Sequence, residues 1–368
     1  MINANVQEVC MGKVTLFFLA SLLYISTVLG AGFHIGEFGG RSAAMGNAVI
    51  AQAYDPSVIF YNPAGLGFLE GTQFYGGVTG ILAKANFVGA APVFDNTVHN
   101  AKEKFFPPVG IYATHRFSEK IAAGVGLTNP FGLGLEWEDN FPGRFISKNV
   151  DLKSFYISPV IAYQISPNVS IAAGVDVVLT SVLLNRNILI FNTEGVPGTG
   201  TEVGEVELSG NGDPTLGFSA GFMYRNDRVG FGVSYRHSVT AEFTDADADF
   251  TVFDSADPNA KAVASALFTD QKGSAAIDFP SILSVGLYYK LTPQLGMEVS
   301  YVYYNWSVFE KIDLKFEDER LNQTIPENYE NSSQVRIGAH YDVNERLSLR
   351  AGYLWDETPQ PIESVSPL

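Results

Sequence analysis

The chain has 368 residues and a formal net charge of −16, and it is 46% hydrophobic but only 17% charged. A nucleic-acid-binding protein usually presents a basic surface, and a disordered chain is poor in aromatic residues, whereas this chain has 27 Phe and 17 Tyr. Both classes are therefore excluded. Abundant glycine and aromatic residues with few charges favour many β-strands.

Cysteine and histidine usage gives no sign of a catalytic or metal site. Cys10 is the one cysteine, and the five histidines are scattered without the spacing of a metal-binding motif. No GxSxG, HExxH or SxxK string places a nucleophile beside a base. We therefore expect no cofactor, no metal and no enzymatic activity.

The first predicted element is an export signal. Residues 14–29 form the longest apolar run, VTLFFLASLLYISTVL, with Lys13 before it. The run is short for a membrane-spanning helix, and small residues follow it, as in a secretory signal peptide. We expect residues 1–30 to be a signal peptide that is cleaved before Ala31, with residues 1–10 either part of it or an upstream extension. The alternative is an uncleaved anchor.

Residues 31–69 differ from the rest of the chain because they are rich in small residues. The pattern predicts a short helix over 42–53 and a turn at 61–65. The segment has no long alternating stretch, so we expect residues 31–70 to fold back as a plug inside whatever the following strands enclose.

From residue 71 onward, apolar and small or polar residues alternate. In the stretch 229–236, for example, Val, Phe, Val and Tyr alternate with Gly, Gly, Ser and Arg. Successive strand residues point to opposite faces, so one face is apolar. Many of these strands are longer than the five or six residues of a soluble sandwich and end in aromatic residues. With the export signal, this favours an all-β transmembrane antiparallel β-barrel over a secreted sandwich.

The connections support this interpretation, because short turns near residues 119, 167, 227, 293 and 345 alternate with long polar segments at 91–107, 138–149, 192–214, 244–278 and 317–332. About eleven strands result, at 72–90, 107–117, 120–137, 149–165, 169–191, 214–226, 228–243, 279–291, 295–316, 333–343 and 346–355. Single-chain bacterial barrels have an even number. We therefore expect residues 71–368 to be a barrel that lacks its last strands.

Several motifs together resemble one family. They are the stretch AGFHIGEF at 31–38, MGNA at 45–48, FYNPAG at 60–65, GVGLTNPFG at 124–132, NWS at 305–307 and RAGY at 350–353. These stretches are similar to the FadL/TodX outer-membrane transporters, which take up long-chain fatty acids and other hydrophobic compounds, and the similarity spans the chain after the signal.

The resemblance implies a fourteen-stranded, monomeric barrel in the outer membrane of a Gram-negative bacterium, with an N-terminal hatch in its lumen. It implies a hatch motif at Asn62, Pro63 and Ala64. It also implies a kinked strand at Asn129–Gly132, where a hydrophobic ligand would leave sideways into outer-membrane lipid.

The residues of the kink give the same prediction a physical basis. Pro130 removes a ladder donor, and Gly132 and Gly134 permit a bend. A carbonyl left unpaired in lipid is costly, so we expect another group to satisfy it, and Asn62 offers an amide. The alternative is that Asn62-Pro63 forms only a tight turn.

Candidate ligand contacts follow from position and chemistry: Phe131, Leu133 and Leu135 for an apolar ligand, and Arg186 and Lys311 for a carboxylate. The acidic residues between 245 and 257 have oxygen ligands that suit a divalent cation, but a solvated loop is the favoured interpretation. Two other functions stay open. One is a general aqueous porin, which would need no apolar plug, and the other is an adhesin-like structural barrel.

We predict that outer-membrane material begins at Ala31, because the apolar core and small residues form a cleavable signal. N-terminal sequencing of the purified protein checks this, and a sequence that begins at Met1 would contradict it.

Overall fold

The computed structural model describes residues 32–89, 96–191, 200–254 and 258–365. The expected signal peptide, its cleavage site and Cys10 lie outside these residues. None of the helices in the described residues has the length and hydropathy needed to cross a bilayer.

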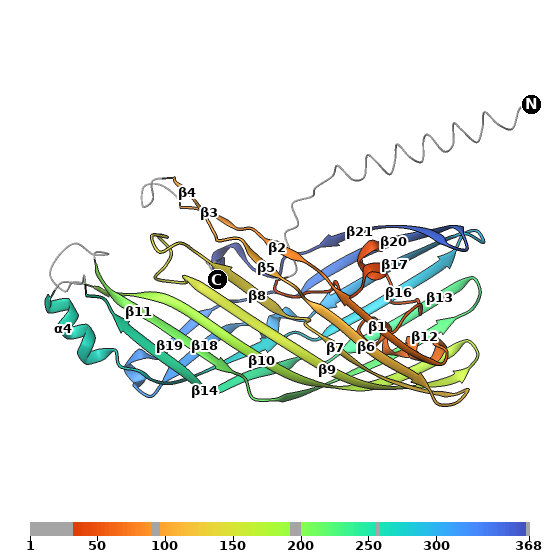
Figure 1. Cartoon of the computed structure of the whole chain (residues 1–368), viewed down its shortest axis with the longest axis horizontal. Coiled ribbons are helices and arrows are strands. Elements are labelled where there is room, and N and C mark those ends of the chain that lie inside the picture. The colour runs from red at the N-terminus through yellow and green to blue at the C-terminus, as the bar shows by residue number, and fades with distance from the viewer. Residues whose placement is uncertain (1–31, 90–95, 192–199, 255–257, 366–368) are drawn as a thin grey trace, which may run out of the picture. The chain divides into compact units, whose positions relative to one another are not determined.

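Eleven strands follow one another in a single antiparallel sheet, as the sequence predicts (Figure 1). In order across the sheet they are β1 (Thr72–Val78), β6 (Val109–Arg116), β7 (Ile121–Thr128), β9 (Asn149–Ser166), β10 (Val169–Phe191), β12 (Thr215–Arg225), β13 (Val229–Arg236), β16 (Ile282–Lys290), β17 (Leu295–Tyr304), β20 (Ser332–Asn344) and β21 (Leu347–Asp356).

The five predicted short turns join consecutive strands at one end of this sheet, on the right in Figure 1. At the other end the long segments are more ordered than the sequence suggests. Besides the eleven strands, the chain contains β8 (Gly132–Glu136), β11 (Gly200–Asn211), β14 (Val239–Val252), α4 (Pro258–Leu267), β15 (Gln271–Phe279), η2 (Trp306–Val308), β18 (Lys311–Phe316), η3 (Glu319–Leu321), β19 (Gln323–Pro326) and η4 (Ile362–Ser364).

The described parts of 192–214 and 244–278 are therefore not plain loops, because most of these residues belong to β11, β14, α4 and β15, and the segment 317–332 contains η3 and β19. Before β6, β2 (Ile81–Ala83) pairs with β5 (Lys104–Phe106), and β3 (Asn86–Val88) pairs with β4 (Val98–Asn100), which makes a separate two-stranded arm. The sequence predicted loops here because the outward faces of these strands are polar. A polar face indicates exposure to water, and it does not exclude a strand.

The acidic residues between 245 and 257 also lie partly on a strand. Asp245, Asp247 and Asp249 lie on β14, where Lys272 pairs with the first two at 3.3 and 2.7 Å. Asp257 lies outside the described residues. No group of acidic, histidine or cysteine side chains in the described ranges has the arrangement of a metal site.

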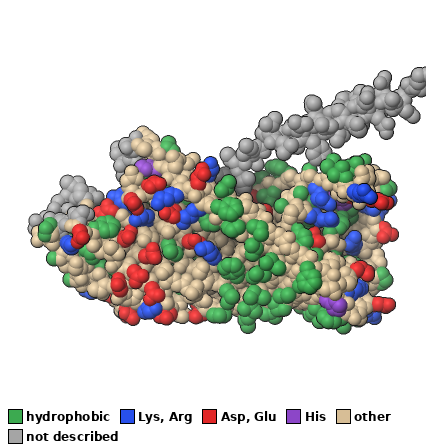
Figure 2. Space-filling model, in the orientation of Figure 1, with side chains coloured by type: hydrophobic (Ala, Val, Ile, Leu, Met, Phe, Trp, Pro, Cys, Tyr) green, Lys and Arg blue, Asp and Glu red, His purple; other side chains and the backbone are tan. Residues whose placement is uncertain are grey.

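The alternation of residues separates two faces of the sheet. On β13 the glycine, serine and arginine positions are buried, whereas Phe231 on the other parity is 37% exposed. The apolar parity therefore faces outward. Figure 2 shows these hydrophobic side chains gathered across the middle of one face, with charged side chains concentrated toward its two ends, as expected of a wall that crosses a bilayer.

Residues 32–69 lie against the buried face of this sheet, and we call them the hatch. They contain α2 (Gly40–Ala44), α3 (Val58–Tyr61) and η1 (Pro63–Phe68). The predicted helix over 42–53 is wrong beyond residue 44. Gly46 and Asn47 have φ of 60° and 59°, and left-handed residues end a helix.

The hatch backbone approaches the wall so closely that only glycine fits at several inward positions. A Cβ at Gly352 of β21 would lie 2.0 Å from the carbonyl carbon of Met45, and one at Gly232 of β13 would lie 2.1 Å from the carbonyl oxygen of Ile50. Other inward glycines in contact with the hatch are Gly110, Gly124, Gly126, Gly221, Gly230, Gly286 and Gly338.

Charged side chains of the wall hold the hatch by hydrogen bonds to its backbone. The Glu298 carboxylate accepts from the N–H groups of Ile50 and Ala51 at 2.5 and 3.1 Å. Arg225 donates to the Ala53 carbonyl at 3.0 Å, and Arg116 donates to the Gly67 carbonyl at 2.6 Å. The hatch is thus bonded to strands on several sides of the wall.

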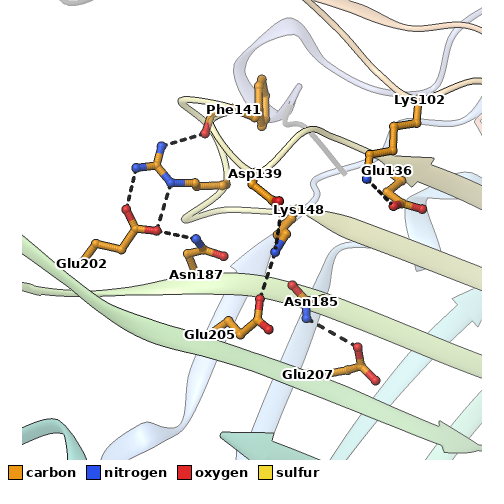
Figure 3. A network of polar contacts seen from close by, with 11 residues as sticks. Lys102, Glu136, Asp139, Phe141, Lys148, Asn185, Asn187, Glu202, Glu205 and Glu207 are labelled. Carbon is orange, nitrogen blue, oxygen red and sulfur yellow. Dashed lines mark hydrogen bonds and ion pairs between the residues drawn. The ribbon is translucent and has the colours of Figure 1, made fainter. Parts of the chain in front are cut away.

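A second polar network fastens the segment between β8 and β9 to the extended ends of β10 and β11 (Figure 3). Arg144 donates to Glu202 at 2.6 and 3.2 Å, and Lys148 bridges Asp139 and Glu205 at 2.9 and 3.0 Å. These charged groups are satisfied by one another, so the network fastens this segment to the wall and does not indicate a ligand site.

We predict that Gly352→Ala displaces the hatch, because the added Cβ overlaps the Met45–Gly46 backbone. Overpacking of this kind costs about 1–3 kcal/mol or more. The measurement is the rate at which residues 32–69 are cleaved by added protease. Gly76→Ala on β1 is the control, since nothing lies within 4 Å of its Cβ position. Equal cleavage of the two variants would contradict the close packing.

Candidate functional site

The wall is interrupted where β7 ends. Strand β7 pairs with β6 on one side and β9 on the other as far as Thr128. When the chain resumes as β8 at Gly132, it pairs with β9, and no register joins it to β6 in the described residues. The predicted kink at Asn129–Gly132 therefore coincides with a break in pairing between neighbouring strands.

Prolines prevent the two sides of this break from pairing. Pro130 on one side has no N–H, and the facing chain carries Pro107 and Pro108. The Pro108 carbonyl is already occupied, because it accepts from Thr79 N at 3.0 Å. The Pro107-Pro108 pair is a functional signal that the sequence prediction missed, although two adjacent prolines before a strand could have revealed it.

Asn129 spans the start of the break with its side chain. Its Oδ1 accepts from Val109 N at 3.0 Å, and its Nδ2 donates to the Ser154 carbonyl at 2.9 Å. The Ser154 hydroxyl in turn accepts from Phe131 N at 3.0 Å and donates to the Phe131 carbonyl at 2.6 Å. Side chains thus replace the ladder bonds that the kink removes.

The beginning of the hatch supplies the remaining backbone partners. Ile35 N donates to the Pro130 carbonyl at 2.8 Å, and Gly132 N donates to the Phe33 carbonyl at 3.0 Å. His34 and Phe131 form an antiparallel bridge between these two bonds. Residues 33–35 therefore act as a short inner strand across the kink.

The expectation that Asn62 would satisfy the kink is wrong. Its Nδ2 donates to the carbonyls of Ile50 and Phe222 at 2.8 and 3.1 Å, and its Oδ1 accepts from Ala64 N at 3.2 Å. Asn62 caps the η1 helix that Pro63 begins and ties it to β12. The tight-turn alternative is the better description, because the hatch reaches the kink through its first residues instead.

A cavity of about 460 Å³ occupies the break. Residues Gly32–Ile35 of the hatch line its inner side, and Phe131, Gly132 and Leu133 line the kinked strand. The remaining lining residues are Ile81, Ala83, Phe106, Pro107, Pro108, Val109, Asn129, Gly134, Asp151, Leu152, Lys153, Ser154 and Phe155.

The same cavity also touches the outer face of the wall. On β9 the buried residues alternate with outward ones, and Lys153 and Phe155 belong to the outward set. Both nevertheless line the cavity. The outward residues Phe155, Ile157 and Ile161 are apolar. Lys153, which precedes them on the same face, pairs with Asp151 at 3.0 Å. Hatch residues and outward residues of β9 therefore line one cavity at the edge of the apolar band.

An aromatic cluster closes the interior on the far side of the first hatch residues. The ring of Phe33 lies 4.7 Å from Trp306, 5.4 Å from Phe309 and 6.2 Å from Phe131, measured between centroids. Phe131 also stacks on Phe279 at 4.6 Å. Removal of Phe33 would expose this cluster to the cavity.

The other candidate contacts are dispersed. Leu135 lies on β8 but does not line the cavity. Arg186 lines a separate small cavity with Leu184, Leu208 and Leu314. Lys311 is half-exposed and pairs with Asp313 at 2.9 Å. Of the predicted apolar contacts, the structure therefore brings Phe131 and Leu133 together, and it separates them from both predicted cations.

The family model described as outer membrane protein transport protein (OMPP1/FadL/TodX) matches residues 22–367. The chain belongs to this family. It is an outer-membrane transport protein with the family's transmembrane β-barrel fold and hatch, as the sequence predicts.

Relatives agree with this assignment. The chain is 26% identical to outer membrane protein P1 of Haemophilus influenzae over 92% of this chain and 81% of that protein. It is 21% identical to the long-chain fatty acid transport protein of Escherichia coli K12, with 91% and 80% covered.

Solved structures show the same fold. A Pseudomonas aeruginosa FadL homologue superposes with a TM-score of 0.76 at 19% identity over 92% of this chain and 84% of that one. The Pseudomonas putida toluene transporter TodX superposes with a TM-score of 0.69 at 17% identity over 92% and 86%.

We predict that Ile35→Pro loosens the kink, because it removes the N–H that pairs with the Pro130 carbonyl. A buried carbonyl without a partner costs about 1–3 kcal/mol. Hydrogen exchange of the peptide that contains Gly132 should become faster, while Ile35→Ala, which keeps the N–H, should leave it nearly unchanged. Equal protection in the two variants would show that the hatch does not hold the kink.

Proposed function

We propose that this protein transports hydrophobic compounds, such as long-chain fatty acids or hydrocarbons, and releases them sideways through the break at Asn129–Gly132. The observation that supports this most directly is the 460 Å³ cavity, which is lined by hatch residues on one side and by the outward-facing Lys153 and Phe155 on the other. Its volume lies within the range of small-molecule sites.

The lining suits an apolar ligand. Phe33, Ile35, Phe131, Leu133 and Leu152 present hydrocarbon or aromatic surface to the cavity. Transfer of apolar surface out of water is favourable by about 25 cal/mol per Å², so a ligand that moves directly from the cavity into lipid avoids an unfavourable passage through water. Outer-membrane lipid is then the acceptor.

The hatch controls this route in our proposal. While residues 33–35 pair with residues 130–132, the inner strand separates the cavity from the aromatic cluster around Trp306. Release of these two hydrogen bonds would open the cavity to a ligand that arrives from the outer end. The wall and the hatch belong to one chain, so a monomer suffices.

Lateral release distinguishes this function from the alternatives. A porin needs an open polar lumen. Here the hatch contacts inward glycines on strands from β6 to β21. Reconstituted protein should therefore show little steady conductance. An adhesin or an enzyme would need neither the break nor the cavity.

We predict that Leu133→Trp reduces uptake of labelled oleate or toluene severalfold or more, because the larger ring fills the cavity. Uptake is measured in a Gram-negative host that lacks its own transporter of this family, at equal surface abundance of each variant. Leu135→Trp is the matched control, since it makes the same change two residues along β8, outside the cavity lining.

Two results would contradict the proposal. One is unchanged uptake in Leu133→Trp, and the other is equal loss in both variants, which would indicate a general effect on β8. Pro130→Val alone is a weaker test, because Pro107 and Pro108 still have no N–H for a ladder and the Pro108 carbonyl already accepts from Thr79 N.

A further inference from the structure

A second, smaller cavity lies behind the hatch residue His34. It has a volume of about 30 Å³ and is bounded by Phe60 and Tyr61 of the hatch and by inward residues of β13, β16, β17 and β20. His34 is the single residue that lines both this cavity and the larger one at the kink. We call the smaller cavity the arginine chamber, because two buried arginines face it.

The two arginines differ in how their charge is balanced. Arg236 pairs with Asp176 at 2.5 Å. Arg336 donates to the Asn47 carbonyl, the Tyr304 hydroxyl and Gln334 at 3.3, 3.1 and 3.0 Å, but all three are neutral. Among the described residues it forms no ion pair with a carboxylate. A buried guanidinium without an adjacent anion is costly, and the chamber is where an anion would relieve that cost.

Neutral donors complete the lining. Ser234 and Ser284 are 6% and 7% exposed and line the chamber, and no side-chain hydrogen bond occupies either hydroxyl among the described residues. The buried Nε2 of His34 likewise has none. Burial, with the charges of Arg336 and Arg236, lowers the pKa of His34 to about 3, so its ring is neutral. Buried polar atoms normally have partners, so these three groups point to a polar occupant.

We propose that the arginine chamber binds the carboxylate of a fatty acid whose alkyl chain occupies the larger cavity. This inference rests on the proposed function and deepens it, because it selects a carboxylate-bearing ligand over a neutral hydrocarbon. The volume fits a group of a few heavy atoms, such as a carboxylate or one or two waters. Two planar guanidinium groups and two hydroxyls match a carboxylate's acceptor sites.

The position of His34 makes the two sites continuous. The ring separates them in the present arrangement, and a rotation of this one side chain would join the apolar cavity to the chamber. The carboxylate would then be buried beside Arg336 while the chain remains among Phe131 and Leu133. Arg186, the cation predicted from sequence, lines a different cavity and would not contribute.

The test measures how strongly the purified full chain in detergent binds oleate and oleyl alcohol, which share a chain and differ in the head group. Wild-type protein should prefer oleate. Arg336→Gln should weaken oleate binding about tenfold to a hundredfold, the effect of losing a charged hydrogen bond, and leave oleyl alcohol unchanged. Arg225→Gln is the control, because it also removes an arginine bond to a hatch carbonyl but lies outside the chamber.

A second variant guards against misfolding of Arg336→Gln. The double change Ser234→Ala and Ser284→Ala removes two chamber hydroxyls without altering any charge, and it should also weaken oleate selectively. Equal affinity of wild type for the two probes, or unchanged oleate binding in both chamber variants, would show that the chamber holds only water and would overturn the inference alone. Failure of both probes to bind wild type would instead contradict the proposed function.

Discussion

The structure depends on one constraint, which is that every backbone N–H and C=O in a wall that crosses lipid needs a partner. Most strands meet it by antiparallel pairing. At Asn129–Gly132 the ladder to β6 is lost, and the chain meets the constraint with the Asn129 amide, the Ser154 hydroxyl and the backbone of residues 33–35. An opening in the wall is therefore possible only because the hatch and two side chains replace the missing bonds.

The same constraint links the hatch to the cavity. Phe33, His34 and Ile35 pair with the kink, line the cavity, and present Phe33 to the aromatic cluster. A single short segment thus closes the wall from inside and lies between the cavity and the interior. Inward glycines such as Gly232 and Gly352 allow the hatch backbone to lie against the wall, and Glu298 fixes its central turn.

Sequence reasoning predicted the eleven strands, their short turns and the kink, because alternation, turn residues and proline are local signals. It missed β11, β15 and the part of β14 beyond residue 243, because their polar outward faces are typical of loops. It also assigned the kink's partner to Asn62, since an amide is a visible donor in sequence while the backbone N–H of Ile35 is common to nearly every residue. Tertiary packing decides which backbone groups meet when they are about a hundred residues apart in the sequence. No local sequence pattern predicts such a contact.

In the route proposed above, residues 33–35 must part from residues 130–132 before ligand can pass. His34 and Phe131 lie directly opposite each other in the bridge, and Cα atoms in such pairs are close enough for a disulfide. The direct measurement is oleate uptake by the variant His34→Cys/Phe131→Cys in a Cys10→Ser background, before and after reduction, with each single cysteine variant as control. Our account predicts that oxidation abolishes uptake and reduction restores it. Equal uptake in the oxidised and reduced states would contradict it.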